Sequence, residues 1–208
     1  MRVLLTVLLV AIGLSAVPGA SLAREAHWRE GGVVGLAYGP AKAKIQSDSL
    51  GTEWLEGPAQ SVRLGWMLNR SLKVGFEHQA WLREQGVQDL KVRAGVQLEA
   101  LGLTVYPWSP GKALAGFYAI AGGGYAHCRL TFLEPLDPGE SPIGNTYEPI
   151  WVKDENGWGW FGGLGYELPI TRTFTASAML TYNAVDIGGE VYDSAQFVPL
   201  TASINWSF

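Results

Sequence analysis

The strongest constraint on the fold is an alternation of apolar and polar residues with a period of two, repeated in short segments along the chain. Alternate residues of a β-strand point to opposite faces, so this period predicts strands. The pattern is found in the segments 62–68, 72–82, 91–99, 158–168 and 173–183. The sequence therefore predicts an all-β chain.

The composition of the two faces favours a membrane barrel over a soluble sandwich. The apolar face is rich in Trp and Tyr, as in the aromatic girdles of a barrel wall, and only 16% of all residues are charged. The side chains on the other face are small or polar, with a few charges of both signs, which suits a narrow lumen. In segment 91–99 the same rule directs Val92, Ala94, Val96 and Leu98 to lipid, and Lys91, Arg93, Gln97 and Glu99 to the lumen.

The predicted connections suggest the number of strands. Long links are expected at about 40–58, 84–90, 134–154 and 186–194, and they alternate with tight turns at about 69–70, 107–111 and 169–172. Outer-membrane barrels place short turns on the periplasmic side and longer loops outside. With a first strand near 32–39, the sequence predicts a single eight-stranded antiparallel transmembrane β-barrel whose two ends lie in the periplasm.

The first 23 residues have the features of a cleaved signal peptide. Arg2 gives a positive start, residues 3–14 are apolar, and residues 21–23 form a small-residue cleavage site. The apolar run is shorter than a spanning helix needs, and Pro18 and Gly19 interrupt it. We expect a signal peptide over 1–23 and one barrel domain over 24–208.

The last segment, 200–208, has an apolar row that ends on an aromatic residue. The row consists of Leu200, Ala202, Ile204, Trp206 and Phe208. This end, together with the runs 105–108 and 117–125, resembles the small outer-membrane barrel families of the OmpA, OmpX and opacity type. The resemblance implies a bacterial outer-membrane location and an assembly signal in that row, and it implies little about activity.

The sequence gives no support for an active site or a cofactor. Gly122 to Gly124 continue a strand with no helix after it, unlike a phosphate-binding loop. His27, His78 and His127 lack the ligand spacing of a metal site, and His127 and Cys128 point to opposite faces of a strand. The His-Xaa-Ser motif of lipid A deacylases is absent. We expect no enzyme, no metal and no cofactor.

The polar face carries charges of both signs that should lie in the lumen. They are Arg63, Lys73, Glu77, Arg93, Glu99 and Glu167. In a narrow barrel such charges pair with one another and block passage, and the alternative is a polar conduit for small solutes.

Two functions therefore remain open. One is a structural or surface-interaction role through the extracellular loops, of which 134–154 is acidic and aromatic. The other is a narrow channel for small or hydrophobic solutes. The expected partners are outer-membrane lipid, lipopolysaccharide and the assembly machinery. We expect a monomer that does not bind nucleic acid, since the net charge is −4.

Overall fold

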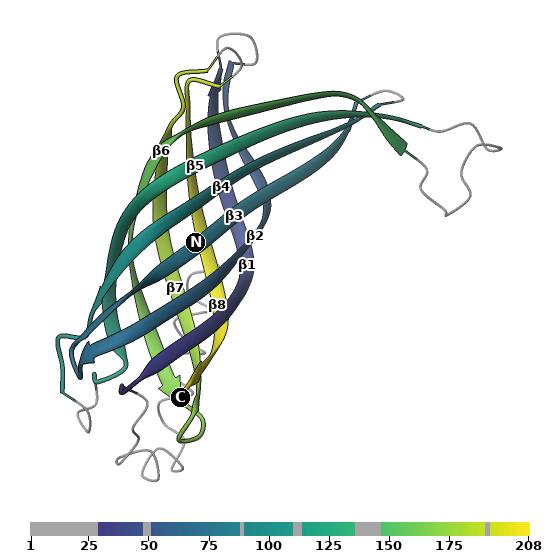
Figure 1. Ribbon diagram of the computed structural model, residues 1–208. Helices are drawn as coiled ribbons and strands as arrows, with labels where there is room; N and C mark the ends of the chain where they lie inside the picture. Colours follow the sequence, from purple (N-terminus) through teal and green to yellow (C-terminus); the bar gives the residue numbers. More distant parts are fainter. Residues whose placement is uncertain (1–28, 48–50, 88–89, 110–113, 136–146, 190–191) are drawn as a thin grey trace.

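Eight strands follow one another in chain order around a closed antiparallel barrel (Figure 1). The computed structural model describes residues 29–47, 51–87, 90–109, 114–135, 147–189 and 192–208. The strands are β1 (Gly32–Ser47), β2 (Gly51–Asn69), β3 (Leu72–Val87), β4 (Leu90–Val105), β5 (Phe117–Pro135), β6 (Tyr147–Pro169), β7 (Phe174–Asp186) and β8 (Ser194–Ser207). No helix among these residues is long and apolar enough to cross a membrane. The predicted fold is confirmed, and the expected signal peptide lies outside the described residues.

The barrel closes between β1 and β8, where the last residue pairs with the first strand. Gly32 N–H donates to the Phe208 carbonyl at 2.9 Å, and Phe208 N–H donates to the Gly32 carbonyl at 3.0 Å. A Cβ atom at Gly32 would lie 2.6 Å from the Phe208 ring, and Gly31 has a φ of 73°. The positive φ requires glycine at Gly31, whereas a side chain at Gly32 would require the Phe208 ring to move.

The register fixes how strongly the strands tilt. One row of paired residues starts at Leu36 and returns to β1 at Gln46, ten residues further along the strand. A barrel of eight strands with this stagger has strands tilted by about 35–45° and an interior just wide enough for side chains. The complete row is Leu36, Val62, His78, Glu99, Tyr125, Trp158, Asp186, Ser194 and Gln46.

The two ends of the barrel differ. The end that carries Gly32 and Phe208 is here called the terminal end. At the other end, β2 stops pairing with β3 at Ala59 and Trp81, and β6 stops pairing with β7 at Trp158. Strands β3 to β6 continue beyond these points, and this four-stranded extension, here called the flap, leans away from β1, β2, β7 and β8 (Figure 1).

The predicted link lengths are wrong at three places. In the segments predicted as links at 40–58, 84–90 and 134–154, the residues that the structure describes are strand, and β1 and β2 stay paired up to Ser47 and Gly51. The prolines in the first of these segments suggested a loop, but Pro40 and Pro58 lie opposite one another within the paired region. At the terminal end, in contrast, the connection from β4 to β5 extends over 106–116. The links therefore do not separate by length as expected.

A belt of large apolar side chains faces outward around the barrel. Its members on β1 to β4 include Leu36, Val62, Leu64, Trp66, Val74, Phe76, Leu101 and Leu103, and those on β6 to β8 include Trp160, Leu164, Leu180, Ile204 and Trp206. Such a surface is unfavourable in water and suits lipid. The facing predicted for β2, β3, β6, β7 and β8 agrees with this belt.

Candidate functional site

The interior near the terminal end contains a layer of buried charges. Arg63 Nε on β2 lies 2.9 Å from Glu77 Oε2 on β3, and the two side chains are 4% and 5% exposed. Their Cα atoms are register partners, so the antiparallel pairing itself brings the charges together. Arg63 also donates to the hydroxyl of Tyr118 at 3.4 Å from β5 across the lumen. The ion pair joins neighbouring strands, and the hydrogen bond to Tyr118 crosses the barrel interior.

Two more predicted charges belong to the same layer. Glu167 on β6 accepts a hydrogen bond of 2.9 Å from the Tyr106 hydroxyl, and both residues are buried. Lys73 on β3 is also buried and interacts electrostatically with Glu167 and Glu77. The charged layer thus consists of Arg63, Lys73, Glu77 and Glu167.

An arginine that the sequence analysis missed lies below this layer. Arg29 precedes β1 and is 2% exposed. Its Nη1 donates to the carbonyls of Trp108 at 2.8 Å and Arg70 at 3.2 Å, and its guanidinium lies 4.2 Å from the centre of the Tyr106 ring. Because Arg29 lies outside the alternating segments, the alternation could not predict that its side chain is buried. The residue fills the terminal mouth of the barrel.

The prediction for Arg93 and Glu99 is wrong, because both side chains point outward. Arg93 donates to Glu84 on the outer wall at 2.9 Å, and Glu99 is 54% exposed. Conversely, Val96 and Leu98, which were expected to face lipid, are fully buried inside the barrel. The pairing of β4 with β3 sets this facing, since inward Glu77 is the register partner of Ala100.

The interior near the flap is mainly apolar. This apolar layer consists of Ala43, Trp81, Val96, Leu98, Cys128, Val185 and Phe197, each at most 3% exposed. The residues come from strands all around the barrel and form one cluster. Apolar side chains offer no hydrogen bonds to water or ions. Buried Asn183, the register partner of Phe197, is a polar neighbour of this layer and donates to the Phe197 carbonyl at 3.2 Å.

The outer face of the flap, beyond the apolar belt, carries ion pairs. Arg129 on β5 donates to both carboxylate oxygens of Asp154 on β6, at 2.6 and 3.1 Å. These hydrogen bonds hold the pKa of the Asp154 carboxyl below its usual range. Hydrogen bonds from Arg93 and Lys91 lower the pKa of Glu84 in the same way. The exposed carboxylates here are already paired with cations.

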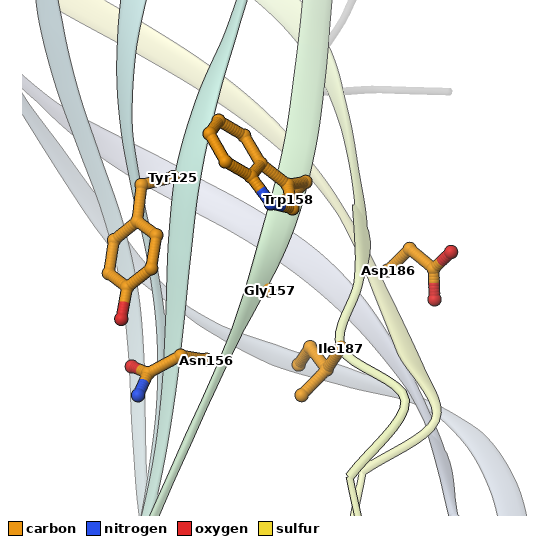
Figure 2. A pocket seen from close by; sticks show the side chains of 6 residues that line it. All are labelled: Tyr125, Asn156, Gly157, Trp158, Asp186 and Ile187. Atoms are coloured by element: carbon orange, nitrogen blue, oxygen red, sulfur yellow. The ribbon is translucent and has the colours of Figure 1, made fainter.

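A shallow pocket of about 390 Å³ lies on the outer wall where β7 leaves β6 (Figure 2). The rings of Tyr125 and Trp158 pack edge to face, with centroids 6.4 Å apart. Asn156 is hydrogen-bonded to His127 at 2.7 Å, which fixes one side of the hollow. The lining is completed by Gly157, Asp186 and Ile187.

The structure shows where His127 and Cys128 lie. His127 lies on the outer wall, whereas Cys128 is buried inside, as their opposite facing predicted. No group of three or more metal-ligating side chains occurs among the described residues. The predicted assembly row lies on β8, and its members Ile204, Trp206 and Phe208 point outward. Its role as a signal stays a prediction.

Comparison with known proteins identifies the architecture. No protein-family model matches the chain, and no curated protein matches it in sequence. Ail, the attachment invasion locus protein of Yersinia pestis, has the same fold with a TM-score of 0.54 and 13% identity, over 85% of this chain and 99% of that chain. Neisserial surface protein A superposes with a TM-score of 0.50 and 17% identity, over 86% and 100%.

The chain is therefore an eight-stranded β-barrel of the outer-membrane type. Its outward apolar belt and this fold together place it in a bacterial outer membrane. The low identities show the fold alone, so the role of the protein must be argued from its own residues.

Proposed function

We propose that the protein is a structural barrel of the outer membrane that acts through its extracellular surface and does not conduct solutes. We orient the barrel with its terminal end toward the periplasm and the flap toward the outside of the cell. The observation that supports a closed interior is its filling by two different layers in series. The charged layer is held by the Arg63–Glu77 ion pair, and the apolar layer above it is packed with fully buried side chains.

The alternative, a narrow channel, would need a continuous path through both layers. A polar solute could exchange hydrogen bonds with the charged layer but would then meet mainly apolar side chains, such as Trp81, Leu98 and Phe197. A hydrophobic solute would suit the apolar layer but would then meet buried charges. Each layer thus excludes the class of solute that the other would accept.

The flap supports a role in surface interaction. It extends the wall beyond the apolar belt and presents charged pairs, the pocket beside Trp158, and the exposed side chains of Ile150, Trp151 and Val152. Exposed apolar groups next to charges are typical of surfaces that bind other molecules. Lipopolysaccharide, bridging cations and host surfaces are the candidate partners of this face.

Conductance in planar lipid bilayers tests the closed interior. The purified protein should insert without producing discrete current steps, and an open porin measured in parallel shows that the bilayer reports channels. A shift in gel mobility between unheated and boiled samples confirms that the inserted protein is folded. Reproducible steps from the folded protein would contradict the proposal and favour the channel.

A further inference from the structure

The outward aromatic girdle near the flap is interrupted on one side of the barrel. Tyr38, Tyr125, Trp158, Trp160 and Tyr182 form this girdle on β1 and on β5 to β7. On β2 to β4 four outward polar residues take the corresponding places, and we call them the polar island. They are Gln60, His78, Gln97 and Glu99.

The polar island lies at the edge of the apolar belt that faces the flap. In its own register row His78 and Glu99 lie between Val62 and Tyr125. Toward the terminal end the island is bordered by Phe76 and Leu101, which are register partners exposed on the outer wall. Toward the flap, Leu82 is still 46% exposed on the outer wall, four residues beyond His78. Apolar groups therefore border His78 and Glu99, whereas Gln97 pairs in register with outward His127, which is hydrogen-bonded to Asn156.

Ionisable side chains that face lipid are unfavourable, and they indicate a functional contact. Within one barrel, His78 Nδ1 and Glu99 Oε1 are 3.8 Å apart, longer than a hydrogen bond. The two side chains remain 28% and 54% exposed. A neighbour that supplies both a donor and an acceptor would satisfy these groups and remove them from lipid.

We propose that the polar island is covered by the polar island of a second copy of this chain, related by a two-fold axis along the membrane normal. A two-fold interface is self-complementary, since each contact is made twice. With the axis between His78 and Glu99, the His78 imidazole of each copy donates to the Glu99 carboxylate of the other copy. Gln60 and Gln97 each supply a donor and an acceptor at the edge of this contact.

Charge complementarity favours this occupant over an anionic lipid. A lipid phosphate would lie against the negative Glu99 carboxylate, and the island contains no lysine or arginine to offset that repulsion. A second copy brings a histidine to each glutamate. This dimer differs from the monomer that the sequence led us to expect, and it does not depend on the proposed closed interior.

Cross-linking in native outer membranes tests the position of the interface. Gln97→Cys places a thiol at the island, and Leu200→Cys places one on β8, outside the island; the natural Cys128 is buried. With a short bis-maleimide reagent we expect a cross-linked dimer from Gln97→Cys and none from Leu200→Cys. Equal yields from the two variants, or no dimer from either, would overturn the proposal.

Complementation between copies tests the chemistry of the contact in the Gln97→Cys background. His78→Glu gives a copy with two glutamates, and Glu99→His gives a copy with two histidines. Each variant alone should lose at least about nine-tenths of the dimer, whereas the two expressed together should form a heterodimer, distinguished by a tag on one copy.

Pairing within one copy cannot produce this rescue, because neither variant contains both residue types at the island. The gel-mobility shift on boiling shows that each variant still folds. Absence of the heterodimer from two folded variants would overturn the proposal. A second result would also overturn the proposal. In that result no dimer is found, and lipopolysaccharide co-purifies with the wild type but not with Glu99→His.

Discussion

The ion pair between Arg63 and Glu77 is the contact on which the charged layer depends most. Glu77→Ala leaves the Arg63 guanidinium buried with no carboxylate beside it, so we expect a loss of about 3–5 kcal/mol in the free energy of unfolding. Guanidinium titration of the protein in lipid vesicles measures this loss. Glu56→Ala is the matched control, because it breaks the exposed pair with Lys42 and should change stability little. Similar effects of the two variants would contradict the assigned role of the buried pair.

The facing of β4 leads to a second prediction at the scale of single residues. Val96→Arg should destabilise the barrel by at least about 3 kcal/mol, because it buries an unpaired charge in the apolar layer. Gln97→Arg adds the same charge one residue further, on the outer wall near the membrane border, and should cost less. The same titration ranks the two variants, and the reverse order would mean that β4 faces the other way.

The alternation in β4 shows what the sequence could and could not predict about facing. Apolar residues occupy even positions at Val96 and Leu98 and odd positions at Leu101 and Leu103, with no bulge between them. The phase changes because the strand passes from the apolar belt into the flap while the lumen changes from charged to apolar. A rule that always directs apolar residues to lipid is right for Leu101 and Leu103, on the terminal side of this change of phase. It is wrong for Val96 and Leu98, on the flap side. Arg93 and Glu99 were misplaced for this reason.

Among the elements, β6 has two parts that differ in the number of strands with which they pair. Between Trp158 and Tyr166 it pairs with both β5 and β7, whereas from Tyr147 to Gly157 the described residues pair it with β5 alone. Amides with partners on both sides open only in larger fluctuations. We expect hydrogen exchange in detergent micelles to be at least about tenfold faster for the edge amides of Ile150 and Val152 than for those at 160–166. Equal protection along β6 would indicate another partner for this edge.

The seam between β1 and β8 depends on Phe208. Its backbone makes two hydrogen bonds with Gly32, and its ring packs on Trp206 with centroids 5.2 Å apart. Phe208→Asp places a charge on the outward row and removes this ring contact, so we expect a severalfold loss of the heat-modifiable form from the outer-membrane fraction. Ile204→Ala, in the same row but inside the strand, is the control and should assemble. Undiminished assembly of Phe208→Asp would contradict a role for this residue in closure or insertion.

For elements, the sequence predicted the number and order of strands but not their lengths. Prolines and charges at 40–58, 84–90 and 134–154 suggested loops, because these residues are uncommon in strands. Among the described residues, several of these charges pair across strands, as Lys42 does with Glu56 on β1 and β2 and Arg93 does with Glu84 on the flap. Cross-strand pairing depends on the register, which a single strand segment does not reveal. The flap was therefore not predicted.

For the whole molecule, the interior contains a charged layer and an apolar layer in series, and this arrangement predicts how the barrel could be opened. Polar interior positions were predictable from alternation, as with Arg63 and Glu167, because that part of the wall faces lipid on its other side. The apolar layer was not predictable, since its residues have the same chemistry as the belt. Only the closed fold shows that Trp81 and Phe197 fill the lumen beyond the charged layer.

The last prediction uses this series arrangement. Removing side chains from the charged layer alone, by Arg63→Ser with Glu77→Ser, should leave the barrel non-conducting, because an apolar constriction resists wetting even where the remaining path is polar. Removing bulk from the apolar layer alone, by Trp81→Ser with Phe197→Ser, should also fail, because the buried charges and Arg29 still fill the other half. The combined variant should produce current steps in planar bilayers. If either pair of changes alone gives the same conductance as the combination, the barrel has one barrier and not two.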